Sequence, residues 1–169
     1  MVATQQQRYQ YHSAHEFFDA ARDAVRDNRS ALKQLREIEE GATASGSGYG
    51  VHVRTSPEPD RIAMLVAAKA ERKERLGIRI ERNERIMDAA GVVIYGTGWD
   101  GFAGIAALLG DTVADVMHWY YLDARKWCEV GGLVGYSPSR CRQMRDAALD
   151  LVDAYGLDKV LDGLGIACD

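Results

Sequence analysis

Two long stretches of the chain place apolar residues three and four positions apart, the spacing of one helix face. The first covers about residues 13–40, and its stripe is Phe18, Ala21, Val25, Asn28, Leu32 and Leu35. The second covers about residues 60–90, with Ile62, Leu65, Ala68, Leu76, Ile80 and Met87. Residues 41–59 between them are rich in glycine, serine and proline and predict a flexible connection. We therefore expect a long, coiled-coil-like helical hairpin over residues 13–90, after a flexible start at residues 1–12.

The pattern leaves two features of this hairpin open. Pairing the two stripes within one chain or between two chains would bury them equally well. Asn28, the polar member of the first stripe, either sets the register of buried helices or faces water in a short hairpin.

A second pattern follows at residues 123–155. Asp123 is a candidate helix cap, and Trp127, Val130 and Val134 form an apolar stripe that ends at Gly135. Glycine suits the left-handed position after a helix, and the next pair, Ser137 and Pro138, is typical of a helix start. These signals predict two helices joined by about three residues, which is a helix-turn-helix.

The second of these helices, residues 138–155, is two-faced. Its apolar face is predicted to carry Cys141, Met144, Ala148, Val152 and Tyr155. Its polar face carries Ser139, Arg142, Gln143 and Asp146, with Arg140 on the flank. Arginine pairs with guanine and glutamine with adenine in the major groove, whereas Arg140 near the positive helix end suits a phosphate. The alternative is an ordinary helical hairpin whose polar face meets only water.

The same residues resemble a known family. The run Ser-Pro-Ser-Arg-Cys-Arg-Gln-Met at residues 137–144, with residues 147–149, is similar to the recognition helix in the fourth region of bacterial primary sigma factors. Residues 120–122, Trp127, 129–130 and 133–137 are similar to the scaffold helix and turn of that region. The resemblance covers about the last third of the chain, and it implies a helix-turn-helix that binds a promoter element.

The whole layout also resembles small phage and prophage proteins in which a long helical hairpin precedes a sigma-like helix-turn-helix, among them late-gene transcription regulators. This resemblance implies an all-α fold: a flexible segment at residues 1–12, the hairpin at 13–90 and a compact helix-turn-helix domain at 91–169.

Charge and cysteine content narrow the class of protein. The net charge of −4 gives no general affinity for nucleic acid, so DNA binding has to come from a local patch such as the three arginines at residues 140–145. The three cysteines Cys128, Cys141 and Cys168 lack metal-ligand spacing and predict a reduced, cytoplasmic protein; core packing is the favoured role of the first two. No apolar run approaches the length of a membrane span, so no membrane partner is expected.

One motif competes with this interpretation. Strand-like residues 92–95 precede the glycines Gly96, Gly98 and Gly101 in the spacing of a dinucleotide-binding loop, and Asp123 follows the strand-like residues 119–122. The long charged helix before this run and the short chain after it disfavour a parallel sheet. We therefore expect no bound dinucleotide. The sequence also has no nucleophile elbow, no zinc pattern and no carboxylate pair that sequence alone can bring together, so we expect no cofactor, no metal and no enzymatic activity.

The sequence as a whole predicts a DNA-binding transcription regulator, encoded by a phage or prophage, that binds double-stranded DNA. The DNA-binding residues are expected to be Ser139, Arg140, Arg142, Gln143, Arg145, Arg125 and Lys126. The expected contacts to base edges come from Ser139, Arg142 and Gln143. Arg140 and Arg145 are expected to face phosphates, and Arg125 and Lys126 would add contacts to the DNA backbone. Host RNA polymerase and a second copy of the chain are further candidate partners. Two alternatives stay open: a DNA-packaging oligomer similar to a terminase small subunit, and an adaptor that binds polymerase without touching DNA.

Overall fold

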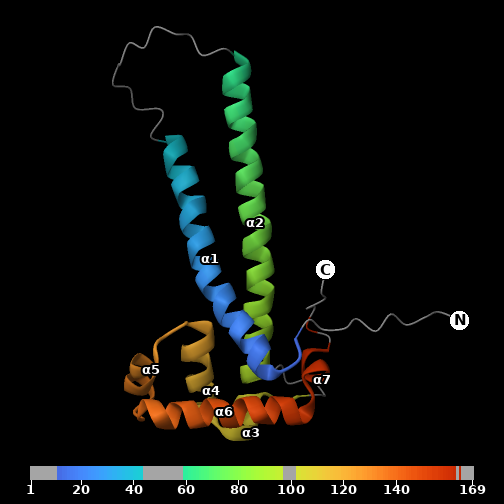
Figure 1. Ribbon diagram of the computed structural model, residues 1–169, viewed down its shortest axis with the longest axis vertical. Coiled ribbons are helices and arrows are strands. Elements are labelled where there is room, and N and C mark those ends of the chain that lie inside the picture. Colours follow the sequence, from blue (N-terminus) through green and yellow to red (C-terminus); the bar gives the residue numbers. More distant parts are fainter. Residues whose placement is uncertain (1–10, 44–58, 97–101, 163, 165–169) are drawn as a thin grey trace, which may run out of the picture. The chain divides into compact units, whose positions relative to one another are not determined.

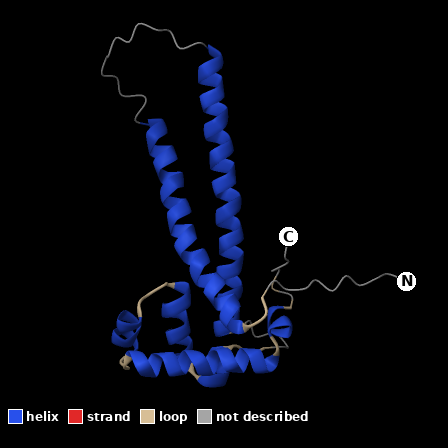
Figure 2. Ribbon diagram, in the orientation of Figure 1, coloured by secondary structure: helices blue, strands red, loops and turns tan. Residues whose placement is uncertain are grey.

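The computed structural model describes residues 11–43, 59–96, 102–162 and 164, and every regular element in these ranges is a helix (Figure 2). The expected all-α fold is therefore confirmed. In chain order the helices are α1 (Ala14–Thr43), α2 (Pro59–Tyr95), α3 (Ile105–Leu109), α4 (Asp111–Met117), the π-helix η2 (His118–Leu122), α5 (Trp127–Val134), α6 (Pro138–Tyr155) and α7 (Leu157–Leu161). Most of the expected connection at residues 41–59 lies outside the described residues.

The chain divides into two compact units, and each long helix contributes to both. One unit combines residues 1–26 with residues 83–169 and holds all the short helices (Figure 1). The other unit, residues 27–82, contains the rest of α1 and α2.

In the unit of residues 27–82, α1 and α2 pack against each other within one chain. Arg79 of α2 forms an ion pair with Asp27 of α1, and the resulting hydrogen bond raises the pKa of Arg79. Further along, Lys73 Nζ lies 2.9 Å from Glu39 Oε1, and Arg72 donates to Gln34. Polar contacts therefore accompany the apolar packing.

The predicted apolar stripes are only partly buried. Leu76 and Asn28 are buried, which contradicts the alternative that Asn28 faces water. Leu65 is 65% exposed, and Leu32 is 42% exposed although its neighbour Ala31 is buried. The buried face of α1 continues from Asn28 to Ala31, three positions later, and Leu32, four positions later, is turned partly out of it.

An aromatic core holds the larger unit together. Phe17 and Phe18 in the first turns of α1 are fully buried, and the Phe18 ring lies 5.1 Å from the ring of Tyr121 in η2. Val93 and Ile94 from the end of α2 join the same core. Residues from α1, the end of α2, α4, η2, α6 and α7 therefore share one core, whereas Val130 of α5 packs in a smaller cluster with Val116 and Cys141.

The strand-like residues 92–95 are the last turn of α2, and residues 119–122 lie in η2. The strands that a dinucleotide-binding loop requires are absent from the described part of the chain. Gly96 has a packing reason instead: its φ is +78°, and a Cβ there would lie 2.2 Å from the carbonyl oxygen of Ala103. Gly98 and Gly101 lie outside the described residues.

Candidate nucleic-acid interface

The predicted helix-turn-helix geometry is present at α5 and α6. Gly135 ends α5 in the left-handed region with φ 76°, and its N–H donates to the carbonyl oxygen of Gly131. Ser137 is the N-cap of α6 and its Oγ accepts a hydrogen bond of 3.2 Å from the N–H of Arg140, with Pro138 as the first helical residue. Both termini are therefore capped as the sequence indicates.

Gly131 allows the turn to fold back tightly onto α5. A Cβ at this position would lie 2.6 Å from the carbonyl oxygen of Tyr136 and 3.5 Å from Cδ of Pro138. A backbone atom cannot move aside as a flexible side chain does, so glycine is required for this close approach. The neighbouring Gly132 has nothing within 4 Å of its Cβ position.

Helix α6 presents its polar face to solvent at its N-terminal end. Ser139, Arg140, Arg142 and Gln143 are all exposed, and Cys141, Ala148 and Val152 on the opposite face are buried. The Arg140 guanidinium donates to Oε1 of Gln143 over 3.2 Å, which holds the two side chains together. The predicted division of α6 into two faces is confirmed, except that Tyr155 is 47% exposed and lies against Phe102.

Charge along α6 is unevenly distributed. The first half carries Arg140, Arg142 and Arg145, whereas the exposed acids Asp146, Asp150 and Asp153 follow. The helix dipole adds partial positive charge at the N-terminal end. An anionic partner is therefore favoured at the start of α6 and disfavoured along its second half.

A column of stacked side chains lies behind this face. The rings of Tyr120 and Trp127 stack with centroids 3.8 Å apart and planes 16° apart. The Arg22 guanidinium of α1 lies 3.8 Å from the Tyr120 ring centroid, and those of Arg145 and Arg142 lie 5.2 Å and 5.7 Å from the Trp127 ring centroid. Cation–π attraction of this kind contributes about 0.5–2 kcal/mol per pair. The column links α1 to Arg142 and Arg145, two of the three arginines of α6.

Arg145 differs from the other predicted DNA-binding residues in its surroundings. Its side chain is only 19% exposed and donates to Asp146 Oδ1 over 2.9 Å and 2.6 Å. Burial alone would lower the pKa of Arg145, but the Asp146 hydrogen bond and the nearby Tyr121 outweigh burial and raise it. Arg145 is therefore charged at any ordinary pH. Its guanidinium lies beside the Trp127 ring and so helps to fix α6 against α5.

Arg125 and Lys126 lie exposed in the segment before α5. The hydrogen bond to Asp123 raises the pKa of Arg125, and the Arg125 carbonyl oxygen accepts a hydrogen bond of 3.0 Å from Arg22. Lys126 is the N-cap residue of α5, and its backbone N–H donates to Glu129 Oε2 over 2.8 Å. The side chains of Arg125 and Lys126 therefore project from a segment whose backbone is hydrogen-bonded to Arg22 of α1 and Glu129 of α5.

Two predictions for α5 are wrong. Asp123 does not cap the helix, because α5 begins only at Trp127 and the Asp123 carboxylate pairs with Arg125. Cys128 is exposed and does not pack in the core, whereas Cys141 is buried as expected. Each residue of a π-helix turns by less than the roughly 100° of an α-helix, and residues 123–126 between η2 and α5 are not helical. Helical periodicity therefore could not place the start of α5 or the orientation of Cys128.

Arg22 and Tyr120 are site residues that the sequence did not reveal. Arg22 lies about a hundred positions before Tyr120 along the chain, and its charge is one among many in α1. Tyr120 and Trp127 are separated by η2 and an irregular segment, so helical periodicity could not predict their stacking.

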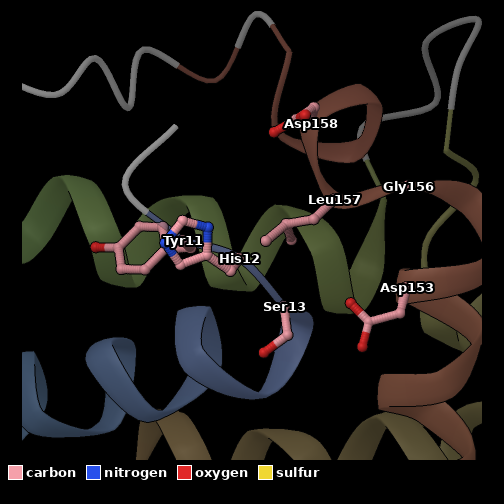
Figure 3. A pocket seen from close by; sticks show the side chains of 7 residues that line it. All are labelled: Tyr11, His12, Ser13, Asp153, Gly156, Leu157 and Asp158. Atoms are coloured by element: carbon pink, nitrogen blue, oxygen red, sulfur yellow. The ribbon is translucent and has the colours of Figure 1, made fainter. Parts of the chain in front are cut away.

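An open cavity of about 600 Å³ lies at the opposite end of α6 (Figure 3). It is lined by Tyr11, His12, Ser13, Asp153, Gly156, Leu157 and Asp158. Among the described residues no group of three or more His, Cys, Asp or Glu side chains could hold a metal ion. Two of its polar side chains, Ser13 and Asp153, accept hydrogen bonds from backbone N–H groups at the start of α1 and so cap that helix. We therefore take α6 and its arginines as the candidate site.

The chain matches no protein-family model, no curated protein and no solved structure in the three comparisons made. None of the described helices is both long enough and apolar enough to cross a membrane.

Proposed function

We propose that this protein binds double-stranded DNA by placing the N-terminal half of α6 in the major groove, and that it regulates transcription by reading a defined sequence. The observation that supports this most is the pairing of a tightly packed turn with an exposed Arg140, Arg142 and Gln143 at a helix N-terminus. A recognition helix presents base-reading residues in this way.

The roles of the side chains follow from their positions. Arg142 and Gln143 point from the exposed face and carry the donors that read guanine and adenine, and Ser139 one turn earlier contributes a hydroxyl. Arg140 at the positive end of α6 binds a phosphate, and Arg125 and Lys126 bind the backbone beside it. Arg145, half-buried beside Trp127, acts through the orientation of α6.

Because the chain has a net charge of −4, its affinity for DNA has to come from the local patch of arginines at the start of α6. Each lysine or arginine that neutralises a phosphate releases about one counterion, so affinity should fall as salt rises. The acids Asp146, Asp150 and Asp153 repel a duplex that lies along the whole of α6. Contact is therefore confined to the first turns of the helix.

The test is selection from a randomised duplex library at two salt concentrations, followed by titration of the enriched duplex. Gln143→Ala should reduce discrimination between bases by about 10-fold or more, whereas Arg140→Ala should weaken all duplexes and reduce the salt slope by about one. Asp150→Asn, on the exposed acidic half of α6, is the matched control and should leave base preference unchanged. Equal losses on selected and random duplexes for both variants would contradict the division into reading and backbone residues.

A second candidate rests on exposed apolar side chains beside the same turn. Leu133 is 54% exposed and Tyr136 is 46% exposed, which favours a protein partner such as RNA polymerase at this end of α5. If the library selection yields no binding at either salt, and Leu133→Lys abolishes co-purification with polymerase, the adaptor function replaces DNA reading.

A further inference from the structure

One face of α2 (Pro59–Tyr95), near its N-terminal end, carries four residues at successive spacings of three, four and three. They are Arg61, Met64, Ala68 and Glu71. At about 100° per residue, this spacing brings all four onto one side of the helix. All four are exposed; Met64 is 73% exposed and the Glu71 side chain 64%. We name these four residues the α2 seam.

The α2 seam is not the face that α1 contacts. Arg72, Lys73 and Arg79 are α2 residues that make polar contacts to α1, and their mean direction around the helix is about a quarter turn from that of the seam. Residue 61 and residues 63–71 of α2 are all exposed, so the described part of this unit does not cover the opening turns of the helix. The seam is left without a partner from the described part of this unit.

The composition of these turns is unusual for a solvated helix. Residues 63–68 are all apolar and all exposed, including Leu65 at 65% and Val66 at 63%. A helix that is apolar on every side is normally surrounded by other helices, and exposed apolar patches of this kind mark association sites. Lys69 directly follows this patch in sequence, and on the seam itself Arg61 and Glu71 lie on either side of Met64 and Ala68.

The order of residues in the seam is complementary to itself when reversed. If two copies of α2 lie antiparallel with their two-fold axis level with Val66, Arg61 of each copy lies level with Glu71 of the other. In the same arrangement the long Met64 side chain of each copy lies level with the small Ala68 of the other. Opposite charges meet, and a large residue meets a small one, on both sides of the axis.

Two copies of α2 in parallel would have neither the opposite-charge contacts nor the pairing of a large residue with a small one. It would place Arg61 opposite Arg61, Glu71 opposite Glu71 and Met64 opposite Met64, so like charges would repel and the large residues would crowd. Within one chain Glu71 Oε1 also lies 3.3 Å from the Arg75 guanidinium, an exposed pair that is worth little and leaves the carboxylate able to accept a second donor. The antiparallel arrangement is therefore the favoured one.

We propose that the α2 seam binds a second copy of this chain, antiparallel, through Arg61 to Glu71 and Met64 to Ala68 contacts across a two-fold axis near Val66. The contact spans about three helical turns, so it buries less than a standard interface, and a dissociation constant on the order of 10 µM is expected. This association is independent of the DNA-binding function proposed above. It would place two copies of α6 in one symmetric assembly.

The test is sedimentation equilibrium of the full chain without DNA, from about 1 µM to 300 µM. Arg61→Glu and Glu71→Arg should each weaken the dimer by at least about 10-fold, because each brings two like charges together. The double variant Arg61→Glu/Glu71→Arg should restore the dissociation constant to within about 3-fold of the original, since the reversed charges again meet opposite partners. Glu74→Arg, exposed on α2 but outside the seam, is the matched control and should have no effect.

Far-UV circular dichroism of each variant checks that α2 keeps its helix content, so that a loss of association is not a loss of fold. A chain that stays monomeric throughout the concentration range would overturn the proposal. So would single reversals that leave the dimer unchanged, or a double variant that is as weak as the single ones. Because no DNA is present, none of these outcomes bears on whether α6 reads a duplex.

Discussion

The Asp153 carboxylate near the end of α6 accepts a hydrogen bond of 2.6 Å from the backbone N–H of Ala14, the first residue of α1. Ser13 Oγ accepts from the N–H of Glu16 in the same turn, and the Glu16 carboxylate accepts from the N–H of His12. The N–H groups at the start of a helix lack intrahelical partners. Asp153, whose side chain lies beside Ser13 in Figure 3, therefore ties the end of the candidate recognition helix to the start of the long helix.

Asp153→Ala should lower the free energy of unfolding by about 1 kcal/mol, because an N-terminal N–H of α1 loses its acceptor and the helix dipole its nearby negative charge. Urea unfolding followed by circular dichroism measures this loss. Asp150→Ala, at an exposed position one turn earlier in α6, should change stability by less than about 0.5 kcal/mol. Equal effects at the two positions would show that Asp153 acts only through its general charge.

Alanine substitution at the adjacent glycines Gly131 and Gly132 of α5 should change the stability of the protein in opposite directions. Gly131→Ala forces a Cβ to within 2.6 Å of the Tyr136 carbonyl oxygen and should destabilise the protein by about 1–3 kcal/mol, since the turn must move. Gly132→Ala meets nothing within 4 Å and should stabilise by up to about 1 kcal/mol, because alanine favours a helix interior. Unfolding midpoints of the two variants compare them directly, and a stabilising Gly131→Ala would refute the close approach of turn and helix.

The stacked column gives α1 a role in the candidate site. Arg22→Met removes the cation over the Tyr120 ring and the donor to the Arg125 carbonyl oxygen, and should cost about 1–2 kcal/mol of unfolding free energy. Arg26→Met, one turn further along α1, breaks only an exposed ion pair with Asp23 and should cost less than about 0.5 kcal/mol. Indistinguishable stabilities of the two variants would mean that the column adds nothing to the fold.

Local signals predicted the helix-turn-helix well, because its determinants lie close together in sequence. Gly135 has a left-handed φ, which glycine favours, and the Ser137 side chain accepts from the N–H of Arg140, three residues later. Both signals can be recognised in the sequence without knowledge of the tertiary structure. Helical periodicity alone also separated the exposed residues of α6 correctly from the buried face. Whether they contact DNA remains the prediction tested by library selection.

Capping signals and helical periodicity could not predict contacts between segments that are distant in sequence. Arg22 packs on Tyr120 and Asp153 caps α1, and neither pairing has a periodic signature in the sequence. Leu65 looked like a buried position because its spacing fits the stripe, yet α1 does not cover it. Spacing defines a face of a helix, but the partner of that face depends on where the neighbouring helix begins and ends.

The two described cysteines should differ strongly in reactivity. Cys128 is exposed, whereas Cys141 is buried, and burial raises the pKa of the Cys141 thiol. The thiolate is the form that reacts, so at a given pH a raised pKa leaves less of it, and burial also blocks access by the reagent. In a Cys168→Ser background, which removes the third thiol, iodoacetamide at pH 8 should modify Cys128 on the order of 100-fold faster than Cys141. Peptide mass spectrometry over time measures both rates, with urea-unfolded protein as the control in which the two should converge. Similar rates in the folded protein would mean that α6 does not hold Cys141 against α5 and would remove the packing on which the recognition-helix proposal depends.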